Sequence, residues 1–134
     1  MTPSPELRSK RKELVLAAEQ VIRKEFSGGE SPDLKKAQLN HLIGICGEAS
    51  CPEEIENYIR YQAGREKKVT GWSIELARLV IESIAPLIKD LTDANKVGAW
   101  QLYAVYLTRA FTYESLVLEE TSSQSRREST RRSK

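Results

Sequence analysis

Apolar residues recur every three or four positions along most of this chain, and this spacing constrains the fold more than any other feature. Two such runs lie within residues 14–22 and 97–111. The spacing places the apolar side chains on one face of an α-helix, whereas a half-buried strand would need strict alternation. No segment of any length shows that alternation. The sequence therefore predicts an all-α fold.

Turn-forming and capping residues divide the pattern into five helices. A breaker cluster with two glycines and a proline occupies residues 27–33, between the first helix and the second. Asp33 is expected to cap the second helix and Thr92 the fifth. Pro86 is expected to kink or break the fourth. The expected helices cover about residues 6–26, 33–46, 52–70, 72–91 and 93–119, and they predict a compact five-helix bundle.

The charged residues divide the chain into a body and a tail. The net charge is +2, but residues 121–134 hold five basic residues against one acid, a net +4 that leaves −2 for residues 1–120. Because the tail has no large apolar side chain, we expect it to be disordered. We therefore divide the chain into a helical domain, 1–120, and a disordered basic tail, 121–134. Nucleic acid would have to contact a local patch of the domain, since its overall charge is small.

Length and the missing targeting signals limit the class of protein. A chain of 134 residues is long enough for one domain with its own core. No apolar run approaches the roughly 20 residues of a membrane-spanning helix, and the N-terminus lacks the apolar core of a signal peptide. We expect a cytoplasmic protein without a membrane partner.

The sequence offers little for catalysis. His41, Cys46 and Cys51 follow one another at intervals of five, which matches no regular zinc motif and lacks a fourth ligand. We expect a half-buried histidine and two small apolar thiols instead. The sequence contains no phosphate-binding glycine loop, serine nucleophile elbow or dinucleotide fingerprint. We therefore expect a protein that is not an enzyme and that holds no metal or cofactor.

The best candidate for a binding surface is the segment 58–69. As one helix it would bury one face and present Arg60, Gly64 and two lysines on the other, with Arg65 at the rim. A glycine inside a helix costs about 1 kcal/mol relative to alanine, so another helix or a phosphate is expected to approach it. Cations on two adjacent helices could follow a nucleic-acid backbone without reading bases, although they could also simply face solvent. The candidate RNA-binding residues are Lys35, Lys36, Arg60, Arg65, Lys67 and Lys68.

Aromatic rings could stack on RNA bases, but their spacing favours structural roles. Trp100, Tyr103 and Phe111 share a helical stripe with aliphatic residues, so we expect them in the core. Trp72 at a helix start and Tyr113 near a helix end are expected at a subunit contact, where these residue types are enriched.

Three sequence elements indicate a family. Residues 61–66 read Tyr-Gln-Ala-Gly-Arg-Glu, and Lys67-Lys68-Val69 follows them. An upstream helix at 34–43 and an aromatic-rich last helix at 102–113 occur in the matching order. Over about residues 33–113, the chain thereby resembles the small subunit of type III-A CRISPR effector complexes, the Csm family.

The resemblance implies a non-catalytic, helical RNA-binding subunit of an antiviral defence complex. Several copies would stack head to tail along the guide RNA–target RNA duplex, beside the backbone subunits that cleave the target and against the large polymerase/nuclease subunit. Arg65 carries the arginine of the family motif. Gln38 and Asn40 stand where the family tends to place Lys and Arg, and Arg60 has no counterpart.

Two other functions fit the same residues. In a protein–protein adaptor, Trp72, Trp100 and Gly64 would lie at interfaces and the cations would face solvent. In a helix-turn-helix DNA-binding regulator, the second and third predicted helices would form the motif. Glu53 and Glu54 at the start of the third helix disfavour that function, because they would face the phosphates.

Overall fold

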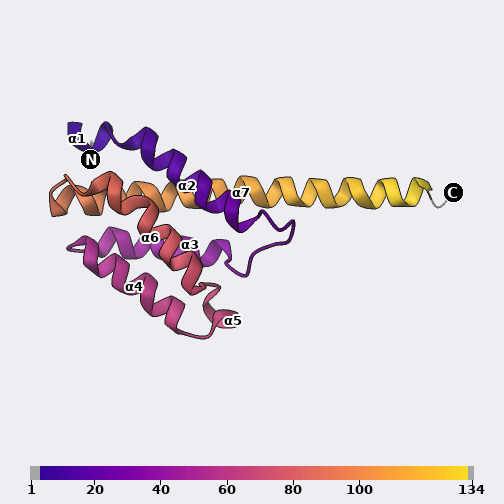
Figure 1. Cartoon of the computed structure of the whole chain (residues 1–134), viewed down its shortest axis with the longest axis horizontal. Coiled ribbons are helices and arrows are strands. Elements are labelled where there is room, and N and C mark those ends of the chain that lie inside the picture. Colours follow the sequence, from indigo (N-terminus) through magenta and orange to yellow (C-terminus); the bar gives the residue numbers. More distant parts are fainter. Residues whose placement is uncertain (1–3, 133–134) are drawn as a thin grey trace.

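The computed structural model describes residues 4–132, except for the side chains of residues 67, 68 and 125–132. Its helices are α1 (Pro5–Arg8), α2 (Arg11–Glu25), α3 (Lys36–Glu48), α4 (Pro52–Gly64), α5 (Lys67–Thr70), α6 (Ile74–Ile88) and α7 (Asp93–Arg132). No strand occurs within this part of the chain, which confirms the predicted all-α class. The five longer helices are the five that the sequence predicts, and α1 and α5 are single turns (Figure 1).

Helix α7 is the longest helix and contacts most of the others. Figure 1 shows it running the whole length of the structure, with α2, α3 and α6 beside its first half and its second half projecting beyond the body. The predicted stripe is buried: Trp100, Tyr103 and Leu107 are all shielded from solvent. The Tyr103 hydroxyl donates to the Val80 carbonyl at 3.1 Å, which ties α7 to α6. The bundle therefore forms around the first half of α7.

The segment predicted as a disordered tail begins within α7, whose backbone continues to Arg132, and the division of the chain at residue 120 stays a prediction. The helix contains one glycine, Gly98, and no proline. An anchored helix can be extended without the cost of nucleating a new one. The lack of large apolar side chains after Thr121 therefore does not by itself end the helix. The hydroxyl of Thr121 also donates to the Val117 carbonyl one turn earlier, at 2.9 Å. The tail is thus part of a helix that extends beyond the compact body.

Several predicted helix boundaries also differ. The first predicted helix divides into α1 and α2 where the Ser9 hydroxyl donates to the Glu6 carbonyl at 2.7 Å. Thr92 caps α7 as predicted, accepting from the Asn95 N–H at 3.3 Å. The break expected at Pro86 is absent, since α6 continues two residues further.

The predicted cap at Asp33 is wrong. Lys35 occupies the N-cap position of α3, and its N–H donates to the Gln38 side-chain oxygen at 2.9 Å. Asp33 and Leu34 instead belong to a connection that crosses Gly71. The segment just before α3 therefore contacts a distant part of the chain.

The helix predicted over 52–70 ends at Gly64 and resumes as α5. Arg65 at the break has extended backbone angles, φ −86° and ψ 173°. The Thr70 hydroxyl reaches back and donates at 3.0 Å to the Gln62 carbonyl, which also accepts from the Arg65 backbone N–H at 3.2 Å. The predicted basic face is therefore not one continuous helical strip.

A close backbone crossing sits at Gly71, which has φ +74°. A Cβ atom at this position would lie 2.7 Å from the Leu34 Cα and 2.8 Å from the Asp33 carbonyl oxygen. Trp72 beside it is buried and its backbone N–H donates to the Thr70 hydroxyl at 3.2 Å, so the predicted subunit contact for this tryptophan is wrong. The crossing packs the segment before α3 against the segment after α5.

We predict that Gly71→Ala lowers the free energy of unfolding by about 2 kcal/mol or more, because a side chain meets both a left-handed φ and neighbouring backbone. Gly64→Ala is the matched control. Gly64 lacks a positive φ, and a Cβ there meets no atom within 4 Å, so the variant should be as stable as the parent or up to about 1 kcal/mol more stable. Urea unfolding followed by circular dichroism measures both. Equal losses in the two variants would contradict the crossing.

Candidate nucleic-acid interface

The crossing at Gly71 gathers cations from two distant segments. Lys35 and Lys36 follow directly after Leu34 at the start of α3, while Arg65, Lys67 and Lys68 lie at and after the end of α4. Figure 1 shows the start of α3 and α5 at the same end of the body, below the projecting half of α7. We call these five residues the basic end. The structure describes the backbone of Lys67 and Lys68, which lies in α5, but it does not describe their side chains.

Arg65 is exposed and folds back onto the last turns of α4. Its guanidinium lies 5.7 Å from the centre of the Tyr61 ring, and Nη1 donates to the Gln62 side-chain oxygen at 3.4 Å. Burial raises the pKa of Tyr58, while a hydrogen bond with Gln62 and the charge of Arg65 act in the opposite direction. No ion pair found within the described residues includes Arg65. Its charge is thus held at the surface without an acidic partner.

Arg60 lies one turn before Gly64 and forms an ion pair with Glu56 at 3.2 Å. Both side chains are accessible to water, and exposed pairs of this kind contribute about 0.2–1 kcal/mol at most. A phosphate could therefore replace Glu56 as the partner of Arg60 at little cost. Arg60 does not belong to the basic end. It lies on α4, close to the C-terminal end of this helix.

A groove of about 390 Å³ runs between α4 and α6 beside Arg60. Gly64 lines this groove. A Cβ atom at Gly64 would meet no atom within 4 Å, so a close crossing with another helix of the described chain does not explain this glycine. Arg78 on α6 lies across the groove from Arg60. The sequence analysis missed Arg78, because its position on an amphipathic helix does not reveal which helix packs against it. The remaining lining residues are Ala63, Ile74, Ala77, Ile81 and Glu82.

The residues considered for a metal do not form a cluster. His41 is exposed, rather than half-buried as expected, whereas Cys46 is fully buried. Within the described residues, no group of three potential ligands lies together. Burial raises the pKa of the Cys46 thiol to about 12, so this cysteine stays protonated at neutral pH. The Cys51 side chain is partly accessible.

The start of α4 disfavours a helix-turn-helix that inserts this helix into DNA. Pro52 occupies its first turn, and Glu53 and Glu54 beside it are exposed. Two carboxylates at the leading end of a recognition helix would face the phosphates that line the groove.

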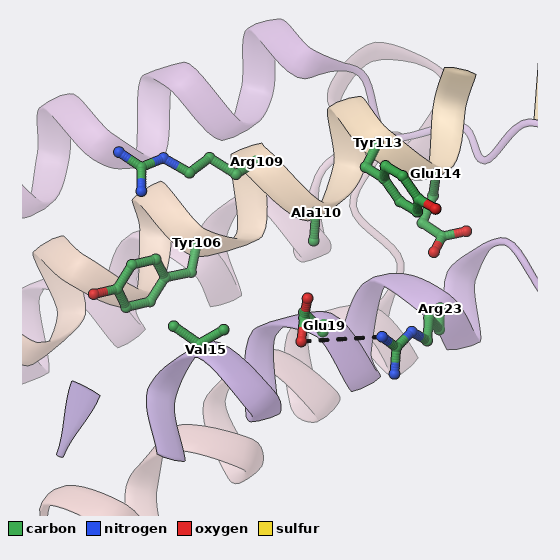
Figure 2. Close-up of a pocket in the computed structure, with 8 residues that line it drawn as sticks. All are labelled: Val15, Glu19, Arg23, Tyr106, Arg109, Ala110, Tyr113 and Glu114. Carbon is green, nitrogen blue, oxygen red and sulfur yellow. Dashed lines mark ion pairs between the residues drawn. The ribbon is translucent and has the colours of Figure 1, made fainter. Parts of the chain in front are cut away.

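A second groove, between α2 and α7, has both apolar and charged lining residues. Figure 2 shows Ala110 pointing into it between the rings of Tyr106 and Tyr113, with Val15 of α2 facing Tyr106 and Glu19 facing Ala110. Its volume is about 280 Å³, and an ion pair at 4.0 Å between Glu19 and Arg23 lies along α2 beside it. This groove lacks a concentration of one charge and is a poor site for a polyanion.

No protein-family model, curated protein or solved structure matches this chain. Among the helices of the described residues, none combines the length and apolar character needed to cross a membrane.

We predict that the two thiols differ in reactivity. At pH 8, a thiol reagent such as DTNB should modify Cys51 in the native protein and leave Cys46 unmodified, because burial both shields Cys46 and raises its pKa. Unfolding in urea should expose the second thiol. Two thiols reacting at similar rates in the native protein would contradict the packing around α3.

Proposed function

We propose that this protein is a non-catalytic RNA-binding subunit that holds an RNA duplex by its sugar–phosphate backbone at the basic end. The observation that supports this proposal most is the crossing at Gly71, which brings the exposed Lys35 and Lys36 to the same end of the body as Arg65 and the backbone of α5. Exposed Lys and Arg side chains in one region neutralise successive phosphates and release counterions, which drives binding without reading sequence.

The placement of the aromatic residues favours backbone contact over base stacking. Trp72, Trp100 and Tyr103 are buried in the core and cannot stack on bases. Tyr61 is exposed beside the basic end, but Arg65 already lies over its ring. The chain thus offers phosphates several cations and offers bases few free rings.

Gly64 has no evident use within the described chain. It has neither a positive φ nor a close neighbour, and it lies between Arg60 and Arg65. A missing side chain there lets a sugar–phosphate backbone approach the end of α4 and reach both arginines. This use explains a glycine that packing does not require.

The sequence resemblance extends the proposal to an assembly. In a type III CRISPR effector complex, several copies of this subunit would line the guide RNA–target RNA duplex, next to the backbone subunits and the large polymerase/nuclease subunit. The small subunit would keep the duplex in register, and other subunits would perform the cleavage.

We predict that Lys35→Ala with Lys36→Ala weakens binding to a short RNA duplex and reduces the salt dependence. Losing two phosphate contacts should make the slope of log K against log salt shallower by roughly 1.4–1.8. The matched control is Arg11→Ala with Lys12→Ala, two adjacent exposed cations at the start of α2. If the control lowers affinity and slope as much, or neither pair changes them, the basic end is not the RNA surface.

We predict that Gly64→Ala lowers RNA affinity without lowering stability, because the added methyl group obstructs the approaching backbone. Gly47→Ala is the control, since Gly47 on α3 is also an exposed helical glycine at which a Cβ would meet no atom within 4 Å. Fluorescence anisotropy with the same duplex measures both. Unchanged affinity in Gly64→Ala would remove the proposed use of this glycine. A parent protein that binds no RNA but captures partner subunits would instead favour the adaptor function.

A further inference from the structure

The outward face of α7 carries an apolar patch. Tyr113, Leu116 and Val117 are exposed to 66%, 55% and 39%, although large apolar side chains usually gain from burial. Their spacing of three and four places them on one face of the helix. The buried residues Trp100 and Leu107 lie on the opposite face, where α7 meets the body. The patch is therefore available to another molecule.

Charged residues bracket this patch symmetrically. Arg109 lies four residues before Tyr113, and Glu120 lies four residues after Leu116. Both are exposed, and the described residues offer neither of them an ion-pair partner. Along the outward face the order is thus a cation, two apolar residues and an anion: Arg109, Tyr113, Leu116 and Glu120. Each charged residue lies four positions from the nearer apolar residue. We call these four residues the α7 stripe.

The α7 stripe is complementary to itself when two copies lie antiparallel. With a two-fold axis between Glu114 and Ser115, Arg109 of each copy faces Glu120 of the other, and Tyr113 faces Leu116. Opposite charges then meet at both ends, and apolar side chains meet in the middle. A parallel arrangement would place like charges opposite each other, which is unfavourable.

The groove between α2 and α7 widens the same surface. Arg109 and Tyr113 of the α7 stripe also line this groove, so a helix laid along the stripe covers the groove as well. Figure 2 shows Ala110 pointing toward α2, while the Arg109 guanidinium lies on the side of α7 away from Val15. A partner helix would therefore meet the rings of Tyr106 and Tyr113 on the side of the groove, and a cation without an ion-pair partner among the described residues on the other side.

We propose that the chain forms an antiparallel, two-fold symmetric dimer in which the α7 stripes of two copies pack together. Such an interface is isologous, so each contact occurs twice. The dimer also gives a packing partner to the half of α7 that projects from the body, where an isolated helix is only marginally stable. It uses none of the proposed RNA-binding cations, and it holds whether or not the basic end binds RNA.

A charge-swap series tests the dimer by sedimentation equilibrium of the full chain. Arg109→Glu and Glu120→Arg should each raise the dimer dissociation constant by about tenfold or more, because each places like charges opposite twice. The double variant should restore the opposite pairs and bring the constant back to within about threefold of the parent. Lys89→Glu, an exposed cation at the end of α6, is the control and should leave the constant unchanged.

Three outcomes would overturn the proposal. The parent, free of RNA and of partner subunits, could stay monomeric at every concentration up to several hundred micromolar, or its mass could grow beyond that of a dimer. The double variant could also fail to recover while its circular dichroism matches the parent. Leu116→Glu gives a second test, since a charge in the centre of the interface should abolish the dimer without unfolding an exposed helical position.

Discussion

The structure depends on the burial of one stripe along the first half of α7. Trp100, Tyr103 and Leu107 fill the space between α7 and the helices around it, and the Tyr103 hydroxyl bonds to the α6 backbone. Because this face turns inward, the opposite face of α7 is left to solvent. The second half of the helix then continues beyond the body (Figure 1). One helix therefore contributes both to the core and to an exposed apolar patch.

The crossing at Gly71 has an equally local origin and a wider effect. A glycine with φ +74° lets the backbone of Leu34 approach so closely that a side chain would not fit. As a result the first residues of α3 and the turn of α5 share one end of the body. The cations of that end are far apart in the sequence, so their joint charge exists only because the crossing forms. Stability and the proposed binding surface thus rest on the same contact.

The sequence predicts the parts of this structure that arise from local periodicity. It does not predict the parts that depend on contacts between residues far apart in the chain. The buried stripe of α7 follows directly from the spacing of its apolar residues. The break after Gly64 is accompanied by a hydrogen bond from the Thr70 hydroxyl back to Gln62, and the buried Trp72 lies beside the crossing; neither is visible in a local pattern. The individual cations could be predicted, whereas their grouping and the place of Arg78 across the α4–α6 groove could not.

The central functional claim is that the basic end, and not the outward face of α7, contacts RNA. Photo-cross-linking of the full chain to a short RNA duplex containing 4-thiouridine, followed by peptide mapping, tests it most directly. We expect cross-links in the peptides that contain Lys35, Lys36 and Arg65, and none in the segment from Tyr113 to Glu120. Cross-links confined to α7, or none at RNA concentrations that saturate binding, would contradict this account.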